Sequence, residues 1–120
     1  MTHVKGRRVY LSGPMTGIEG WNRPAFDEAE KRLRELGAQE PYNPANFIGR
    51  FESLSHAVCM YRSLVELVDE EWSTEPGYPT PWYDLLVSLP GWEKSAGARL
   101  EREVATACGI EVCDLDEVIA

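Results

Sequence analysis

Apolar and polar residues follow one another along this chain in blocks that predict strands alternating with helices. The apolar runs at Arg8–Ser12 and Asp84–Leu89 predict strands, and the second run is continuous enough to be central and buried on both faces. Weaker strands are expected at Ala38–Tyr42, which Pro41 restricts to a sheet edge, and at Ile110–Val112.

Three helices are expected between these strands. The first opens at Trp21–Pro24, with Asn22 as its N-cap, and ends at Gly37. Its apolar face consists of Phe26, Ala29, Leu33 and Leu36. The second helix, Ser53–Asp69, has the clearest apolar stripe of the chain, formed by Leu54, Ala57, Val58, Tyr61, Leu64, Val65 and Val68. The third helix, Ala98–Cys108, is expected to turn inward Leu100, Val104, Ala107 and Cys108.

Strands that alternate with helices are typical of a mostly parallel sheet covered on both faces. We therefore expect an α/β fold, a three-layer sandwich with a small sheet of four to five strands, built by one domain over residues 1–120. Asp114 and Glu117 have the spacing of a capping box for a final helical turn.

A long connection separates the second helix from the third strand. Residues 70–82 contain three prolines and a glycine, so they are expected to form a loop. The loop carries Trp72, Tyr78 and Trp82, and such aromatic residues suit a lid, a subunit contact or a substrate wall equally well.

Charge narrows the range of partners. The 120 residues contain 12 basic and 20 acidic side chains, a net charge of -8, which disfavours a nucleic acid polymer because phosphate backbones need a basic footprint. A nucleotide-sized anion is still compatible, since helix N-termini bind anions locally. No apolar run approaches the ~20 residues of a membrane span, so no membrane contact is expected.

Cysteine and histidine usage indicates a reduced, metal-free protein. Cys59, Cys108 and Cys113 are odd in number and form no CxxC motif, so we expect free thiols and a cytoplasmic location. His3 and His56 stand alone, so we expect neither a metal site nor a cofactor, and we interpret His56 as structural.

The stretch from Leu85 to Glu101 carries the most information about chemistry. It predicts a buried strand, a loop broken at Pro90 and Gly91, and a helix whose first turn contains Glu101. Ligands of open α/β sheets bind in the crevice beyond the carboxyl ends of the strands. A helix N-terminus also favours a nearby carboxylate by ~0.3–1 kcal/mol, so we expect Glu101 to be ionised at neutral pH.

Three motifs together resemble a known family. Residues 10–15 (YLSGPM), 42–45 (YNPA) and 89–101 (LPGWEKSAGARLE) are similar to the nucleoside 2-deoxyribosyltransferase-like superfamily, in particular to its short branch common in bacteria and phages. The resemblance implies a flavodoxin-like fold, a homo-oligomer, and a small-molecule nucleoside or nucleotide as the partner.

The resemblance also implies roles for individual residues. Glu101 matches the glutamate that attacks the anomeric carbon of the sugar, and Ser95 matches a group that holds the sugar's 5′ end, where serine accompanies a 5′-phosphate. Gly97 matches a glycine that lets the ligand approach the backbone. The first motif matches a loop that lines the base and sugar pocket, here Tyr10, Ser12, Gly13, Pro14 and Met15. Trp92 is a candidate to stack on the base, or else a packing anchor.

Active members of that superfamily also carry an acid that assists the leaving base. Asp69 and Glu66 are the candidates here, whereas Asp84 stands at the start of a strand and is interpreted as structural. The implied activity is cleavage or transfer at the N-glycosidic bond of a (deoxy)nucleoside or deoxynucleoside 5′-monophosphate, that is, an N-deoxyribosyltransferase or deoxynucleotide N-glycosidase.

Three alternatives stay open at this point. Glu101 could simply suit the helix dipole, and Ser95 could simply cap the helix. The chain could be a non-catalytic nucleotide or nucleotide-sugar binding module that has lost the base-handling acid. It could also be a structural protein whose aromatic loop contacts a partner.

Overall fold

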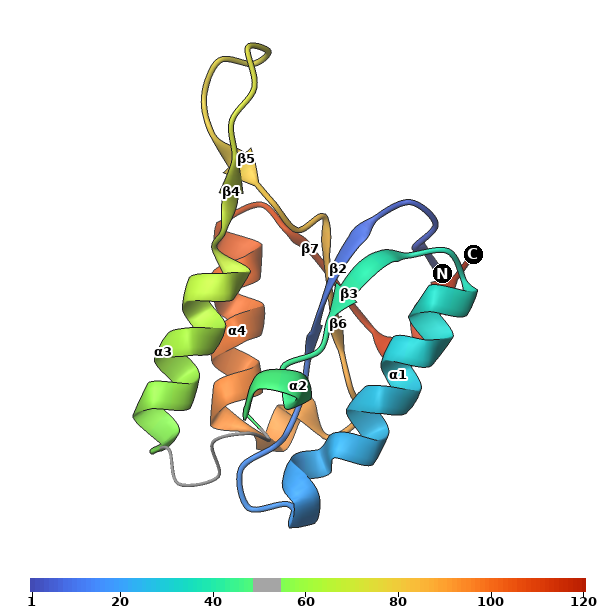
Figure 1. The fold of residues 1–120 in the computed structure, drawn as a ribbon, viewed down its shortest axis with the longest axis vertical. Coiled ribbons are helices and arrows are strands. Elements are labelled where there is room, and N and C mark those ends of the chain that lie inside the picture. The colour runs from blue at the N-terminus through green and yellow to red at the C-terminus, as the bar shows by residue number, and fades with distance from the viewer. Residues whose placement is uncertain (49–54) are drawn as a thin grey trace.

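Two layers of helices enclose a central parallel sheet. The computed structural model describes residues 1–48 and 55–120. Helix α1 (Arg23–Glu35) lies on one side of the sheet, whereas α3 (His56–Leu67) and α4 (Ala96–Ala107) lie side by side on the other (Figure 1). This arrangement confirms the predicted three-layer α/β sandwich.

The sheet has four strands in the order β3-β2-β6-β7, all parallel. They are β2 (Arg8–Ser12), β3 (Gln39–Tyr42), β6 (Leu85–Ser88) and β7 (Glu111–Asp114). As predicted, β6 is central and fully buried, and β3 forms an edge. The chain passes from β2 to β3 on one side and later adds β6 and β7 on the other side of β2. The gap between the carboxyl ends of β2 and β6 is therefore a topological switch point.

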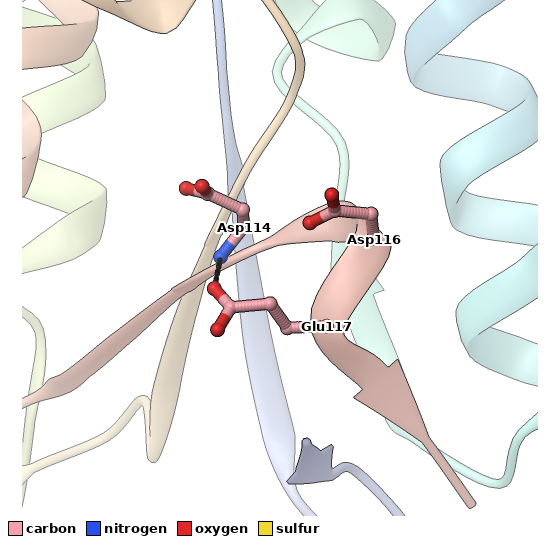
Figure 2. Close-up of side chains that lie close together, drawn as sticks. All are labelled: Asp114, Asp116 and Glu117. Carbon is pink, nitrogen blue, oxygen red and sulfur yellow. Dashed lines mark hydrogen bonds between the residues drawn. The ribbon is translucent and has the colours of Figure 1, made fainter.

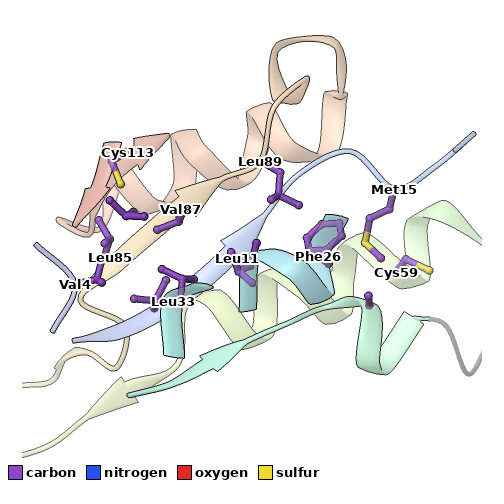
Figure 3. Close-up of a cluster of buried hydrophobic side chains, with 14 residues drawn as sticks. Val4, Leu11, Met15, Phe26, Leu33, Cys59, Leu85, Val87, Leu89 and Cys113 are labelled. Atoms are coloured by element: carbon purple, nitrogen blue, oxygen red, sulfur yellow. The ribbon is translucent and has the colours of Figure 1, made fainter. Parts of the chain in front are cut away.

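Side chains of the central strands alternate between two apolar clusters. Leu11 and Val87 face α1 and pack with Phe26 and Leu33 (Figure 3). Tyr10 and its neighbours in β6 and α4 form the second cluster, on the side of α3 and α4. The predicted apolar face of α1 is confirmed, with Phe26, Ala29 and Leu33 buried and Leu36 partly buried against the same cluster.

Asn22 precedes α1 as expected, but it does not cap the helix with its side chain. Its backbone is left-handed (φ 60°), and its Nδ2 donates to the carbonyl of Pro14 at 2.9 Å. The residue therefore fastens the turn after β2 to the start of α1.

The apolar faces predicted for the other two long helices are wrong in register. In α3 the buried residues are Cys59, Ser63 and Leu67, while five members of the expected stripe are exposed: Ala57, Val58, Tyr61, Val65 and Val68. Leu54, which was expected to belong to the same stripe, lies outside the described residues. In α4 the buried residues are Ala98, Glu101 and Ala105, whereas Leu100, Ala107 and Cys108 are exposed. Polar residues thus occupy core positions in both helices.

The connection expected to be a loop contains a hairpin. Strands β4 (Glu70–Glu71) and β5 (Thr80–Pro81) pair antiparallel and project from the end of α3 (Figure 1). Trp72 and Tyr78 are exposed on it.

Short elements complete the chain. They are β1 (Thr2–His3), η1 (Glu19–Asn22), α2 (Ala45–Ile48), η2 (Trp92–Lys94), η3 (Leu115–Glu117) and β8 (Val118–Ile119). Strand β1 pairs with β8, and the capping box of Asp114 and Glu117 opens η3 as predicted. Among the described residues, no helix has the length and apolarity needed to cross a bilayer.

Candidate active site

The candidate site lies at the carboxyl ends of β2 and β6, beside the switch point of the sheet. The turn after Ser12 lies next to the N-terminal half of α4. Glu101, in that half of the helix, therefore lies at the carboxyl edge of the sheet. Glu101 lies in the second turn of α4, not in the first turn as predicted, because the helix begins at Ala96 with Ser95 as its N-cap. Its side chain therefore points toward the sheet, and the residue is only 7% exposed.

Two hydroxyl groups hold the Glu101 carboxylate. The Tyr10 hydroxyl donates to Oε2, and the Ser12 Oγ donates to Oε1 at 3.2 Å. None of the ion pairs between described residues involves Glu101. The carboxylate is thus positioned by neutral donors and has no cationic partner within residues 1–48 and 55–120.

Burial dominates the electrostatics of this group. Removal from water raises the pKa of Glu101 to about 7, although the hydrogen bonds from Tyr10 and Ser12 each lower that pKa. Burial therefore works against the carboxylate form that we expected the helix N-terminus to favour at neutral pH. The desolvation cost exceeds the small stabilisation from the helix dipole, and the group exchanges a proton near pH 7.

Tyr10 connects the site to α3. Its hydroxyl lies 3.2 Å from the carbonyl of Ser63, a second acceptor besides Glu101. Its ring stacks on Tyr42 at 5.1 Å and meets Tyr83 edge-on at 5.5 Å. Burial is the largest cause that raises the pKa of Tyr10 well above its ordinary value, so this residue acts as a hydrogen-bond donor.

A small cavity of ≈ 50 Å³ adjoins Glu101. Its walls come from the turn after β2, from α3 and from the start of α4, and they include Gly13, Met15, Ser63, Ser95 and Gly97. A wider groove of ≈ 580 Å³ includes Pro14 and Lys94. The two hollows share four residues, Thr16, His56, Ser95 and Gly97, so together they lead from Glu101 to the protein surface.

Two glycines of the site lack a side chain for different reasons. A Cβ on Gly13 would lie 2.7 Å from the Cβ of Leu89, so the turn after β2 can approach β6 only without a side chain there. A Cβ on Gly97 would lie 3.2 Å from the Sδ of Met60, the flexible end of a side chain. Gly97 therefore leaves room in the cavity itself.

Ser95 performs the capping role that the sequence allowed. Its Oγ accepts a hydrogen bond from the backbone N–H of Ala98 at 3.2 Å. The side chain still lines both hollows. Capping and ligand contact are compatible here, because a serine hydroxyl can also donate a hydrogen bond.

Several predicted site residues do not line either hollow. Tyr10 and Ser12 are fully buried and contact Glu101 instead of lining the cavity. Trp92 lies against Arg102, whose Cζ is 4.1 Å from the ring centroid, and donates its Nε1–H to Asp114 at 3.1 Å. Of the two interpretations of Trp92, the contacts favour the packing anchor.

The acidic candidates lie at the opposite end of the sheet. Asp69 follows the C-terminal end of α3 and is exposed, and Glu66 accepts a hydrogen bond from the Tyr83 hydroxyl at 2.9 Å. Asp84 accepts from the backbone N–H of Arg8 at 2.8 Å, which fastens the start of β2. A groove of ≈ 1360 Å³ along β3 includes Glu66 and Asp84 but not Glu101. The structure therefore brings none of these carboxylates to the candidate site.

Sequence reasoning missed Lys94, which lines the groove, and also His56 and Thr16. The side chains of His56 and Thr16 lie 3.3 Å apart (Nδ1 to Oγ1) and line both hollows. His56 was interpreted as structural, yet it is exposed at the first position of α3. The sole signal in the sequence was its position beside the Ser55 N-cap, which does not reveal what the side chain faces.

One acidic cluster away from the cavity has the spacing of possible metal ligands. Oxygen atoms of Asp114, Asp116 and Glu117 lie within 4.8 Å of one another (Figure 2). Glu117 accepts from the Asp114 backbone N–H at 2.8 Å, and Asp114 accepts from Arg102 at 2.9 Å. These contacts account for the cluster as a helix cap and an ion pair.

Comparison with known proteins yields one match. The model of a protein family described as "Domain of unknown function (DUF4406)" matches residues 7–70 and 80–114. The matched ranges include the turn after β2, α3 and the whole of α4. No curated protein and no solved structure matches the chain.

Proposed function

Because the chain belongs to the DUF4406 family, a domain of unknown function, we propose an activity from its own residues. The protein cleaves or transfers at the N-glycosidic bond of a deoxynucleoside or deoxynucleoside 5′-monophosphate, with Glu101 as the nucleophile. The observation that carries this proposal is a buried carboxylate that two hydroxyl groups hold at the edge of a cavity and that pairs with no cation in the described part of the chain.

The chemistry suits this carboxylate. Departure of the base takes the electron pair of the C1′–N bond and leaves an oxocarbenium-like sugar. A Glu101 oxygen then bonds to C1′ and forms a covalent intermediate, as in other carboxylate nucleophiles. Water then releases the sugar by hydrolysis, or the nitrogen of a second base takes it by transfer, and in either case the attacking group gives up a proton to the residue that protonated the leaving base. In either case the C1′–O bond breaks and its electrons return to Glu101.

The leaving base must gain a proton. Among the described residues that line the two hollows, His56 is the group best suited to deliver it, because histidine is the side chain that most often transfers protons in enzymes. We place proton delivery at His56 in preference to Asp69, which lies at the other end of α3.

The groove favours a phosphorylated substrate. Lys94 and Ser95 line it immediately before the first turn of α4, where helix N–H groups attract anions. The groove volume of ≈ 580 Å³ lies within the range of about 300–1,000 Å³ typical of small-molecule sites. The narrow cavity would then receive the sugar, and the groove would receive the phosphate.

Release of free base from a panel of deoxynucleosides and their 5′-monophosphates tests the proposal. Glu101→Gln should lower the rate by about 10³-fold or more, because it removes the nucleophile and leaves the shape intact. Glu103→Gln, an exposed change in the same helix, is the matched control and should leave the rate unchanged. Equal rates in the Glu101→Gln variant and the original protein would contradict the proposal.

A second function is kept because of one observation. Burial raises the pKa of Glu101 to about 7, so near neutral pH this group can also serve as a neutral hydrogen-bonding group. A binding module for a nucleotide or nucleotide sugar would use it in that way. Tight binding without turnover, equal in the original protein and the Glu101→Gln variant, would favour this second function.

A further inference from the structure

The hairpin of β4 and β5 carries exposed aromatic side chains. Trp72 and Tyr78 are 67% and 60% exposed. The hairpin projects from the end of α3, at the end of the sheet opposite Glu101, so it cannot close over that residue of its own chain (Figure 1). The family model matches the chain up to residue 70 and again from residue 80. The tip, residues 71–79, is therefore a feature that the family model does not describe.

Trp92 shows how this protein holds an arginine side chain. The Cζ of Arg102 lies 4.1 Å from the centroid of the Trp92 ring. Its Nη1 lies 2.9 Å from Oδ1 of Asp114, and the same oxygen accepts a hydrogen bond from the Trp92 Nε1 at 3.1 Å. The indole ring attracts the guanidinium by a cation–π interaction, and the carboxylate beside the ring pairs with its charge.

The base of the hairpin repeats this combination of tryptophan, carboxylate and arginine. The Cζ of Arg8 lies 4.3 Å from the centroid of the Trp82 ring, and its Nη2 lies 2.8 Å from Oε2 of Glu71 in β4. The backbone N–H of Trp82 also donates to the carbonyl of Asp69 at 2.9 Å. These contacts fasten the base of the hairpin to the start of β2 and leave the tip projecting.

Trp72 and Glu70 form a third pair of indole and carboxylate, but this pair holds no arginine. The Trp72 Nε1 donates to Oε1 of Glu70 at 3.1 Å, as Trp92 does to Asp114. Successive side chains of a strand point to opposite faces, so Glu70 lies on the face of β4 that is turned away from Arg8. In the described part of the chain, none of the cation–π contacts involves Trp72 and none of the ion pairs involves Glu70.

A hollow beside Glu70 offers room for a neighbouring side chain. Its volume is ≈ 170 Å³, and its walls include Val68, Pro79, Pro81 and Ile110. This volume lies below the range of about 300–1,000 Å³ typical of small-molecule sites. The hollow therefore suits one apolar side chain of a longer chain better than a complete small molecule.

We propose that Trp72 and Glu70 bind an arginine side chain of a partner protein, and that the hollow receives an apolar side chain of the same extended segment. Charge favours this occupant. Residues 69–82 contain four acidic and no basic side chains, and the whole chain has a net charge of -8. This charge attracts a basic segment, whereas it repels nucleic acids and anionic membranes.

Binding of short synthetic peptides tests the proposal. The probe is a library of peptides with arginine at the centre and varied apolar residues beside it, and fluorescence anisotropy measures the binding. At least one member should bind, and citrulline in place of its arginine should weaken that binding by about tenfold or more, because citrulline has nearly the same shape without the charge. Added salt should weaken the binding too. Failure of every peptide to bind, or equal binding of the citrulline form, would overturn the proposal.

Two pairs of variants locate the contact on the protein. Trp72→Ala should weaken peptide binding by about tenfold or more, whereas Tyr61→Ala, which removes an equally exposed ring from α3, should not. Glu70→Gln should weaken binding by roughly threefold or more, whereas Glu75→Gln, an exposed change on the same hairpin, should not. Circular dichroism confirms that each variant is folded. Equal losses within either pair would mean that the peptide recognises general charge or apolarity, which would overturn the proposed contact.

Cys108 gives an independent readout of the same place. It lines the hollow and is exposed, whereas Cys59 and Cys113 are buried. Bound peptide should slow the reaction of Cys108 with a thiol reagent severalfold, and Glu101→Gln should leave this protection unchanged, because the proposed catalysis lies at the other end of the sheet. A peptide that binds without protecting Cys108 would contradict the site. Equal protection by free arginine at the same concentration would identify an amino acid as the ligand and overturn the proposal of a protein partner.

Discussion

The hydroxyl group of Tyr10 on β2 donates a hydrogen bond to Glu101 on α4, although 91 residues separate the two along the chain. Ser12, two residues further along the same face of β2, holds the other carboxylate oxygen. One strand therefore fixes both oxygens of the proposed nucleophile. Burial raises the pKa of Glu101, and the hydrogen bonds from Tyr10 and Ser12 lower it, so the balance between them sets the pH at which this carboxylate titrates.

The activity should rise with pH through about 7, because the proposed nucleophile must be ionised and its pKa is about 7. Tyr10→Phe removes a hydrogen bond that lowers this pKa, so its pH–rate profile should move to higher pH. Tyr83→Phe is the matched control, since that hydroxyl binds Glu66 instead. Base release is measured from pH 5 to 9. A Tyr10→Phe profile that stays in place or moves to lower pH would contradict the role given to this bond.

The free energy of unfolding should carry the same signature without any substrate. The folded-state pKa of Glu101, about 7, lies above the ordinary value of 4.5, so the folded protein binds the extra proton between these values. This contribution is fully present below pH 4.5 and is lost as the pH rises through 7, by roughly 3 kcal/mol in total.

Urea unfolding of the original protein and of Glu101→Gln at several pH values from 4.5 to 8 measures this contribution. The stability of the original protein relative to the variant should decrease as the pH rises. A difference that is constant across this range would mean that Glu101 titrates normally in the folded state.

The two glycines of the site should respond differently to alanine. Gly13→Ala should destabilise the fold by about 1–3 kcal/mol, because the new methyl group would overlap Leu89. Gly97→Ala should leave the stability equal or higher, since Met60 can shift and alanine favours a helix by roughly 0.5–1 kcal/mol. The same Gly97→Ala change should weaken substrate binding, because its methyl group enters the cavity.

Thermal unfolding and Michaelis kinetics of both alanine variants separate these effects. If Gly97→Ala binds substrate as well as the original protein does, the cavity beside Glu101 is not where the sugar binds.

His56→Gln should lower the rate of base release by about 10²-fold or more if the imidazole protonates the leaving base. The loss should be smaller for substrates whose base leaves readily without protonation. His3→Gln, which alters a histidine next to the chain terminus, is the matched control. Initial rates for several bases give the comparison, and a loss equal for all of them would indicate a positioning role for His56.

Sequence reasoning predicted the buried face of a helix correctly where the apolar residues lie on one side of that helix only. Helix α1 buries Phe26, Ala29 and Leu33 as expected because the rest of that helix is polar. The same reasoning failed in α3, where apolar residues occupy both the inner and outer faces and periodicity cannot choose between them. In α4 it failed because Glu101 takes a core position that a hydrophobic pattern assigns to Leu100.

The candidate site was predictable where it lies on one continuous motif. Glu101, Ser95 and Gly97 come from a single stretch and meet at one cavity. His56 and Thr16 come from two segments 40 residues apart, and they approach each other only because α3 begins above the turn after β2. Local sequence carries no record of such a meeting, which depends on how the helices cover the sheet.

The Ser63 carbonyl gives the Tyr10 hydroxyl an alternative when Glu101 loses its negative charge. A buried donor with a single acceptor would lose its hydrogen bond each time a proton or a covalent bond neutralised that acceptor. Here the hydroxyl can rotate to the α3 backbone and return afterwards. The Tyr10 hydroxyl thus has a hydrogen-bond acceptor whether Glu101 is charged or neutral.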